Sequence, residues 1–194
     1  MPNLSLPLLS AVIALALGCG SAATGPTTSE PLTPDRLYPL EQGLVWSYNV
    51  DTGDDTPPTL AISQIVGAEG NRFEVQNNRS EVVVYERRPE GIWRVATETY
   101  LLRTPIEEGA EWAGPSGRTM RIAAMNERVE TTSQTFEGCV RVEEGGGADR
   151  RTIVTVYCPD VGPVMVESSM QAQLTGRNAA VRAVLLGYGS TEAP

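Results

Sequence analysis

Short runs of β-branched and aromatic residues, separated by turn-forming residues, fill the chain from Leu37 onward. Such runs predict strands, because Gly, Pro, Asn and Asp interrupt extended backbone and favour turns. The predicted strands are Leu44–Val50, Thr59–Val66, Arg72–Gln76, Glu81–Arg88, Ile92–Thr99, Thr119–Met125, Arg128–Thr132, Val140–Glu143, Thr152–Tyr157, Val164–Met170 and Val181–Leu186. Their regular spacing, without long helical segments between them, predicts an all-β fold in one domain spanning residues 36–190. We expect an antiparallel sandwich or half-barrel.

Hydrophobic and polar residues alternate in several of these runs. In Thr59–Val66, the larger residues Leu60, Ile62 and Val66 alternate with Thr59, Ala61 and Ser63. Side chains of a strand point alternately to its two faces, so this pattern predicts that the Leu60 face is buried and the other is exposed.

One stretch recurs in degenerate form along the chain. Pro39-Leu40-Glu41-Gln42-Gly43-Leu44-Val45-Trp46 is matched, 66 residues later, by Pro105-Ile106-Glu107-Glu108-Gly109-Ala110-Glu111-Trp112. Pro ends the preceding structure, Gly permits a turn, and Trp enters the sheet with a large apolar surface. We interpret the motif as a strand entrance used twice, the alternative being two related halves.

The N-terminal segment is apolar and uncharged, with an h-region from Leu8 to Leu17, too short to span a bilayer. We expect residues 1–18 to be a signal peptide. Gly18-Cys19 at its end resembles the lipobox of bacterial lipoproteins, which implies that Cys19 carries acyl chains, palmitate among them. The alternative is an ordinary signal peptide cut elsewhere. Residues 19–35 would form a disordered tether and 191–194 a disordered tail.

The charge balance excludes several classes of function. The net charge is −9, which opposes binding of nucleic acid, and all 15 basic residues are arginines. Without His the chain lacks the usual general base and the commonest metal-binding side chain. Without Lys it has no Schiff-base residue. We therefore expect no enzymatic activity, no catalytic residue, no metal site and no cofactor.

Two further cysteines are placed to pair with each other. If the strands around them form a hairpin centred near Ala148 and Asp149, Cys139 lies opposite Cys158. An exported chain is in an oxidising compartment, so we predict a structural disulfide between them. Two buried free thiols or a redox pair are the alternatives.

The mature chain resembles a group of small bacterial envelope lipoproteins. The resemblance rests on Tyr38-Pro39-Leu40, Gly43, Trp46 and Tyr48, then on Pro105, Gly109 and Trp112, and finally on Phe136-Glu137-Gly138-Cys139 and on Tyr157-Cys158-Pro159-Asp160-Val161-Gly162-Pro163-Val164. It implies an all-β envelope domain. Some members look similar to the half-barrel of LolA-type lipoprotein carriers, which implies a lipid-facing concave sheet.

Other clusters have both a structural and a functional interpretation. We expect Asp51, Asp54 and Asp55 to form a solvated turn rather than a Ca²⁺ site, and Glu107, Glu108 and Glu111 an exposed acidic turn. The arginine pairs Arg87-Arg88 and Arg150-Arg151 are expected to be solvated strand ends. Trp46, Trp93 and Trp112 are expected in the core.

Together these features predict a non-enzymatic structural or interaction protein of the cell envelope. It would be anchored by Cys19, and Gly20 after that cysteine resembles sorting to the outer membrane, facing the periplasm. Its partners would be the membrane and an envelope protein or lipid, not nucleic acid. The alternative is a carrier of a lipid or other hydrophobic ligand, which an interior pocket would favour.

Overall fold

The computed structural model describes residues 30–171 and 178–191. The predicted signal peptide, Cys19 and most of the predicted tether lie outside these residues. Contacts divide the chain into two units, Met1–Glu30 and Pro31–Pro194, and the second unit contains all the described helices and strands. Its elements are α1 (Pro34–Leu37), β1 (Leu44–Asp51), β2 (Thr59–Glu69), β3 (Arg72–Asn77), β4 (Glu81–Arg88), β5 (Gly91–Arg94), η1 (Val95–Thr97), β6 (Thr99–Arg103), β7 (Glu111–Ala113), η2 (Pro115–Gly117), β8 (Thr119–Glu130), β9 (Thr135–Gly145), β10 (Arg151–Cys158), β11 (Gly162–Gln171) and β12 (Asn178–Ser190).

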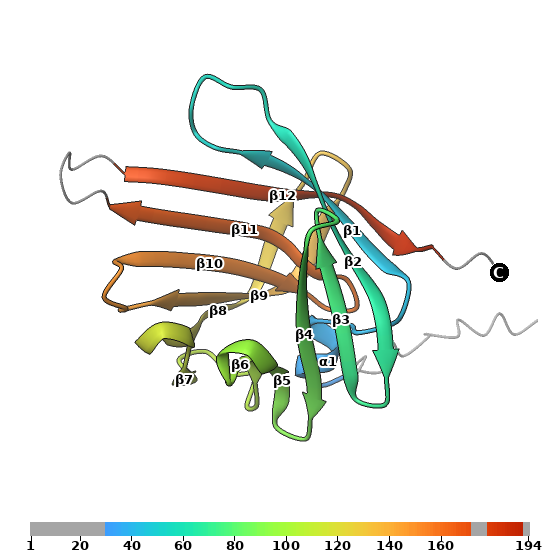
Figure 1. Cartoon of the computed structure of the whole chain (residues 1–194). Coiled ribbons are helices and arrows are strands. Elements are labelled where there is room, and N and C mark those ends of the chain that lie inside the picture. The colour runs from blue at the N-terminus through green and yellow to red at the C-terminus, as the bar shows by residue number, and fades with distance from the viewer. Residues whose placement is uncertain (1–29, 172–177, 192–194) are drawn as a thin grey trace, which may run out of the picture. The chain divides into compact units, whose positions relative to one another are not determined.

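All twelve described strands belong to one antiparallel sheet, so the predicted all-β class is confirmed. Each strand pairs with its neighbour in sequence except β6 with β7, and β1 pairs with β12. The sheet curves until it nearly closes, with β2 to β4 on one side and β9 to β12 on the other (Figure 1). At the open seam the indole Nε1 of Trp112 in β7 donates to the carbonyl oxygen of Tyr100 in β6 at 2.9 Å. The fold is therefore the half-barrel alternative, not a two-sheet sandwich.

Most predicted strands agree with the structure to within a few residues, and the exceptions have local causes. The run Ile92–Thr99 is interrupted by η1, so that it covers β5 and only the start of β6. The two strands predicted on either side of Asn126 are one strand, β8, in which Asn126 has a positive φ of 58° and the pairing register shifts. A bulge absorbs this residue without ending the strand. The three-residue strand β7 was not predicted.

The two copies of the strand-entrance motif have the same backbone geometry. Gly43 and Gly109 both have φ of 84°, which favours glycine. The amide of Gly43 donates to Ile65 at 2.9 Å, and that of Gly109 donates to Ile122 at 2.8 Å. Each copy thus makes the same turn and then enters a strand, β1 in one case and β7 in the other.

The motif residues from distant parts of the chain pack together. Trp46 is fully buried, and its indole Nε1 donates to the carbonyl oxygen of Val161 at 2.6 Å. A Cβ on Gly162 would lie 3.0 Å from that nitrogen. The Tyr48 hydroxyl donates a hydrogen bond to the carbonyl oxygen of Pro163 at 2.9 Å. Of the three tryptophans expected in the core, Trp46 and Trp112 are buried, whereas Trp93 is only partly buried.

Helix α1 is fixed to the turn between β10 and β11. Thr33 caps the helix, which begins at Pro34, two residues before the predicted start of the domain. Arg36 pairs with Asp160 through Nε at 3.0 Å, and the amide of Asp160 donates to the Arg36 carbonyl at 2.6 Å. These contacts place Tyr38, which follows the helix, in the buried core.

The prediction that the Leu60 face of β2 is buried is wrong. Leu60 is 63% and Val66 40% exposed, whereas Ile65 is fully buried. Pairing with β1 sets the face, because Ser63 lies opposite Trp46 and Ala61 opposite Tyr48. The concave side therefore receives Ala61, Ser63 and Ile65 of β2.

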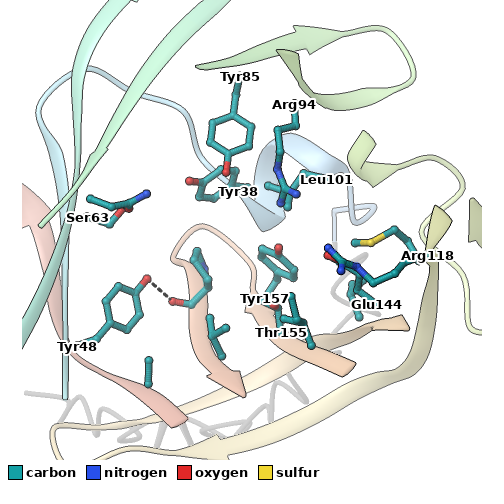
Figure 2. A pocket seen from close by; sticks show the side chains of 17 residues that line it. Tyr38, Tyr48, Ser63, Tyr85, Arg94, Leu101, Arg118, Glu144, Thr155 and Tyr157 are labelled. Carbon is teal, nitrogen blue, oxygen red and sulfur yellow. Dashed lines mark hydrogen bonds and ion pairs between the residues drawn. The ribbon is translucent and has the colours of Figure 1, made fainter. Parts of the chain in front are cut away.

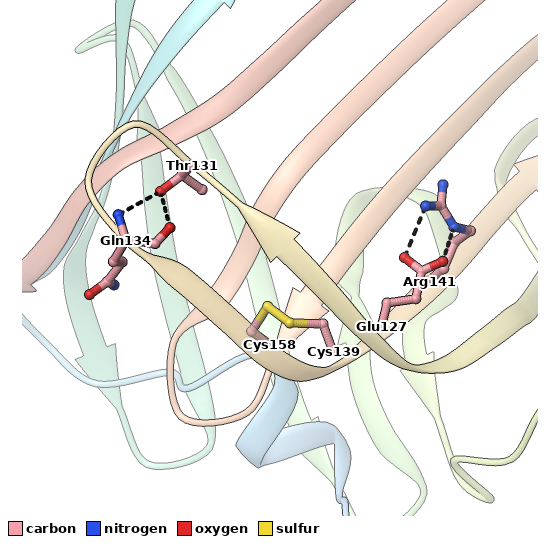
Figure 3. Close-up of a disulfide and its surroundings, with 6 residues drawn as sticks. All are labelled: Glu127, Thr131, Gln134, Cys139, Arg141 and Cys158. Atoms are coloured by element: carbon pink, nitrogen blue, oxygen red, sulfur yellow. Dashed lines mark hydrogen bonds and ion pairs between the residues drawn. A yellow bond between two sulfur atoms is a disulfide. The ribbon is translucent and has the colours of Figure 1, made fainter.

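The predicted disulfide is present between Cys139 of β9 and Cys158 of β10 (Figure 3). The pairing register places Val140 opposite Tyr157, which continues to Cys139 opposite Cys158. Both cysteines are fully buried. Arg141, farther along β9, pairs with Glu127 of β8 at 2.7 Å.

Among residues 30–171 and 178–191, no helix is long and apolar enough to cross a membrane.

Candidate ligand cavity

The concave side of the sheet contains a cavity of about 440 Å³ (Figure 2). Its walls combine tyrosines, two arginines, one glutamate and aliphatic side chains from most of the strands. Binding sites for small molecules have volumes of about 300–1,000 Å³ and combine apolar walls with a few polar groups. In volume and lining, the cavity is of this kind.

One end of the cavity is built from tyrosines on three separate elements. The ring of Tyr38 meets those of Tyr85 on β4 and Tyr157 on β10, with centroids 5.6 and 6.4 Å away and edge-to-face geometry. Burial raises the pKa of each of these phenols, and also that of Tyr48. They therefore stay protonated at neutral pH and keep their hydroxyl protons, one of which Tyr48 already donates to the carbonyl oxygen of Pro163.

Arg94, the last residue of β5, points into this tyrosine end (Figure 2). Burial opposes its charge, but Tyr85, Tyr157 and Glu144 outweigh that effect, so the pKa of Arg94 is above its ordinary value. Arg94 is partly buried and forms no ion pair with a carboxylate in the part of the chain that the structure describes. The polar partner of its guanidinium is the phenol of Tyr85.

The other charged groups of the cavity neutralise each other. Arg118 Nε lies 2.6 Å from Glu144 Oε1, and the two side chains are only 10% and 7% exposed. Arg118 also reaches Asp149, in the turn outside the cavity lining, at 2.7 Å. Two arginines and one glutamate line the cavity, so its lining has a formal charge of +1 in a chain of −9.

The opposite end of the cavity is apolar and more exposed. Val166 on β11 and Ala183 on β12 lie opposite each other in the sheet and line the cavity. On the same face, Val181 and Met170 continue the row toward the ends of these strands and are 40% and 45% exposed. Ser168 lies between Val166 and Met170 and bonds to Arg151 of β10 at 3.1 Å. The concave face thus changes from tyrosines and Arg94 at one end to mainly aliphatic groups, with Ser168 and Arg151 beside them, at the other.

The residues that the sequence offered as candidates for a disulfide, a metal site or an anion contact do not line the cavity. Cys139 and Cys158 do not line the cavity. Asp54 accepts hydrogen bonds from Thr52 and Thr56 in an exposed turn. No group of three or more potential metal ligands occurs within residues 30–171 and 178–191. The arginine pair Arg87-Arg88 ends β4, with side chains 40% and 36% exposed that form ion pairs with Asp35 and Glu86.

The cavity residues were not recognised as a group from the sequence. Tyr38, Tyr48, Tyr157 and Pro163 stood out only as part of turn and core motifs, although all four line the cavity. Arg94 was not singled out at all. A charged residue directly after Ile92-Trp93, inside a predicted strand, was the available signal.

Comparisons with known proteins do not identify a family. No protein-family model and no curated protein matches the sequence. One similar solved structure is that of a protein of Bacteroides fragilis, predicted to be exported and described as having a YmcC-like fold. The TM-score is 0.48 and the identity 11%, over 79% of this chain and 98% of that one. At these values the likeness gives no information on function.

Proposed function

We propose that this protein binds a small amphiphilic ligand in the cavity, without turning it over, as a lipid-anchored component of the bacterial cell envelope. The cavity of about 440 Å³ on the concave face is the observation that carries the proposal. A structural role needs no such space, because a sheet that only supports an assembly can fill its concave side with side chains. The presence of an apolar and a polar end favours a ligand that has both.

Binding without catalysis is supported by the residue types of the chain. The sequence contains neither His nor Lys. The carboxylate that lines the cavity, Glu144, is held by Arg118 at 2.6 Å. The Glu144 oxygen that Arg118 engages is thereby taken up by this pair and is not free to accept a proton from a ligand.

Native mass spectrometry of residues 20–194, exported through a cleavable secretion signal, tests this proposal. We expect a bound mass that disappears under denaturing conditions and that extraction identifies as an amphiphile. The binding proposal fails if the chain carries no bound mass and takes up none of a panel of amphiphiles added afterwards. The structural role would then be the better explanation.

The proposed anchor is the acylated Cys19. The lipobox-like Gly18-Cys19 supports this anchor. The small, polar residues after Cys19 support it as well, because they would separate the domain from the membrane. An anchored position in the outer membrane would bring the cavity close to a source of amphiphiles in the periplasm.

Cell fractionation of the native chain and of Cys19→Ser tests the anchor. We expect the native chain in the membrane fraction, with a mass increase that labelled palmitate accounts for, and the variant in the soluble periplasmic fraction. If both chains fractionate alike and neither is labelled, an ordinary signal peptide is the correct interpretation.

A further inference from the structure

The tyrosine end of the cavity has the properties of an anion site. Arg94 supplies a permanent positive charge, and the phenol of Tyr85 is its polar partner. The one carboxylate in the cavity lining, Glu144, is engaged by Arg118 at 2.6 Å. A charge withdrawn from water is stabilised by a partner of opposite sign, and within the described chain Arg94 forms no ion pair with a carboxylate, although Glu144 acts on it from farther away.

The groups around Arg94 favour an acceptor-rich ligand. Tyr38, Tyr85 and Tyr157 contribute phenol groups to the same end of the cavity, and burial keeps them protonated. The planar fork of a guanidinium matches carboxylate and phosphate oxygens in a two-point contact. A neutral hydroxyl or amide would use fewer of these donors and would leave the charge of Arg94 unpaired.

The mainly aliphatic end of the cavity indicates the chemistry of the ligand beyond its head group. From Val166 through Ser168 to Met170, four residues along β11, the row on the concave face extends about 13 Å at the usual rise of a strand. Val181 on β12 adjoins this row and is 40% exposed. An aliphatic chain lying there would cover side chains that are otherwise in contact with water.

We propose that the ligand is an acidic amphiphile whose carboxylate or phosphate group pairs with Arg94 at the tyrosine end, while its aliphatic chain lies along Val166 and Ala183 toward Met170. This inference rests on the proposed binding function, and it names the chemical class that the cavity selects. A fatty acid and a monoalkyl phosphate are the two sources of such a head group.

Calorimetric titration of the chain from residue 20 onward with matched probes tests the inference. The probes are decanoate, decyl phosphate and decanol, which share one chain, together with acetate and inorganic phosphate, which lack it. We expect at least one of the acidic amphiphiles to bind more tightly than decanol. We expect the small anions to bind far more weakly than either. Preference for decanoate or for decyl phosphate distinguishes a fatty acid from a phosphate lipid.

Arg94→Gln should weaken binding of the preferred acidic probe by about 10- to 100-fold, the usual worth of hydrogen bonds to a charged group. Its affinity for decanol should stay unchanged. Arg121→Gln is the matched control, because Arg121 on β8 does not line the cavity, is exposed, and pairs with Glu143 at 3.2 Å. We expect this control to bind like the native chain.

Each of the other possible outcomes contradicts a specific part of the inference. If decanol and the acidic probes bind equally to the native chain, the anion site is wrong and the binding function stands. If acetate or inorganic phosphate binds as tightly as the long probes, the aliphatic part is wrong. If nothing binds, the proposed function itself fails. Should Arg94→Gln not fold, the comparison of decanoate with decanol in the native chain decides.

Discussion

The buried pair of Arg118 and Glu144 allows a quantitative test of the cavity wall. Their side chains are 10% and 7% exposed, and the Nε to Oε1 distance is 2.6 Å. Glu144 has Arg118 as its ion-pair partner in the described residues, whereas Arg118 also reaches Asp149, which is 45% exposed. Removing Arg118 leaves Glu144 without its ion-pair partner, whereas removing Glu144 leaves Arg118 paired with Asp149. The two substitutions should therefore lower the free energy of unfolding by different amounts.

Arg118→Met leaves the buried Glu144 carboxylate without its ion-pair partner. Breaking a buried pair in this way costs about 3–5 kcal/mol of the free energy of unfolding. Glu144→Leu leaves Arg118 with Asp149, so we expect a smaller loss of about 2–3 kcal/mol, because one exposed partner compensates only part of the charge. The double variant, which removes both charges and keeps apolar volume, should unfold within about 1 kcal/mol of the native chain.

Urea unfolding of the four chains, followed by tryptophan fluorescence, measures these free energies. The double variant should be far more stable than the sum of the single losses predicts, which is the signature of two coupled residues. The reasoning is refuted if the two losses simply add, or if Glu144→Leu costs more than Arg118→Met. Either result would mean that packing, not charge, is what these side chains contribute.

Three further predictions concern the stability of the fold. Replacing Cys139 and Cys158 together by Ala should lower the free energy of unfolding by about 3 kcal/mol in urea titrations, given a sequence separation of 19 residues; equal stability of the native chain with and without reductant would contradict it. Gly91→Ala should lower the free energy of unfolding by about 2–4 kcal/mol, because φ is +146° and the new Cβ would lie 2.0 Å from the Leu102 oxygen. Gly70→Ala, with open space around the new Cβ, should lower it by only about 1 kcal/mol in the same assay. Alkaline titration followed by tyrosine absorbance and circular dichroism should show stability that is complete below the ordinary tyrosine pKa of about 10 and falls as pH rises above it, since the unfolded chain releases those protons first. The phenols whose pKa burial raises should then ionise together with unfolding, and ionisation before unfolding would contradict this; they are Tyr38, Tyr48, Tyr85 and Tyr157.

Local patterns in the sequence determined much of the fold. Turn residues and β-branched runs located most strands, because these preferences act within a few residues. The Cys139–Cys158 pairing came from the same logic, since a hairpin with a known centre sets which residues face each other. The repeated entrance motif also proved local, with the same turn at Gly43 and Gly109.

Only the tertiary structure decided which faces are buried and where the cavity lies. Leu60 and Val66 of β2 point outward, because β1 and β12, joined across the whole length of the domain, set the concave side. Arg94 looks in sequence like any other arginine in a strand. Its burial arises when Tyr38, Tyr85 and Tyr157, from three distant segments, converge around it. Curvature and long-range pairing are properties of the assembled sheet, and no local pattern of the chain encodes them.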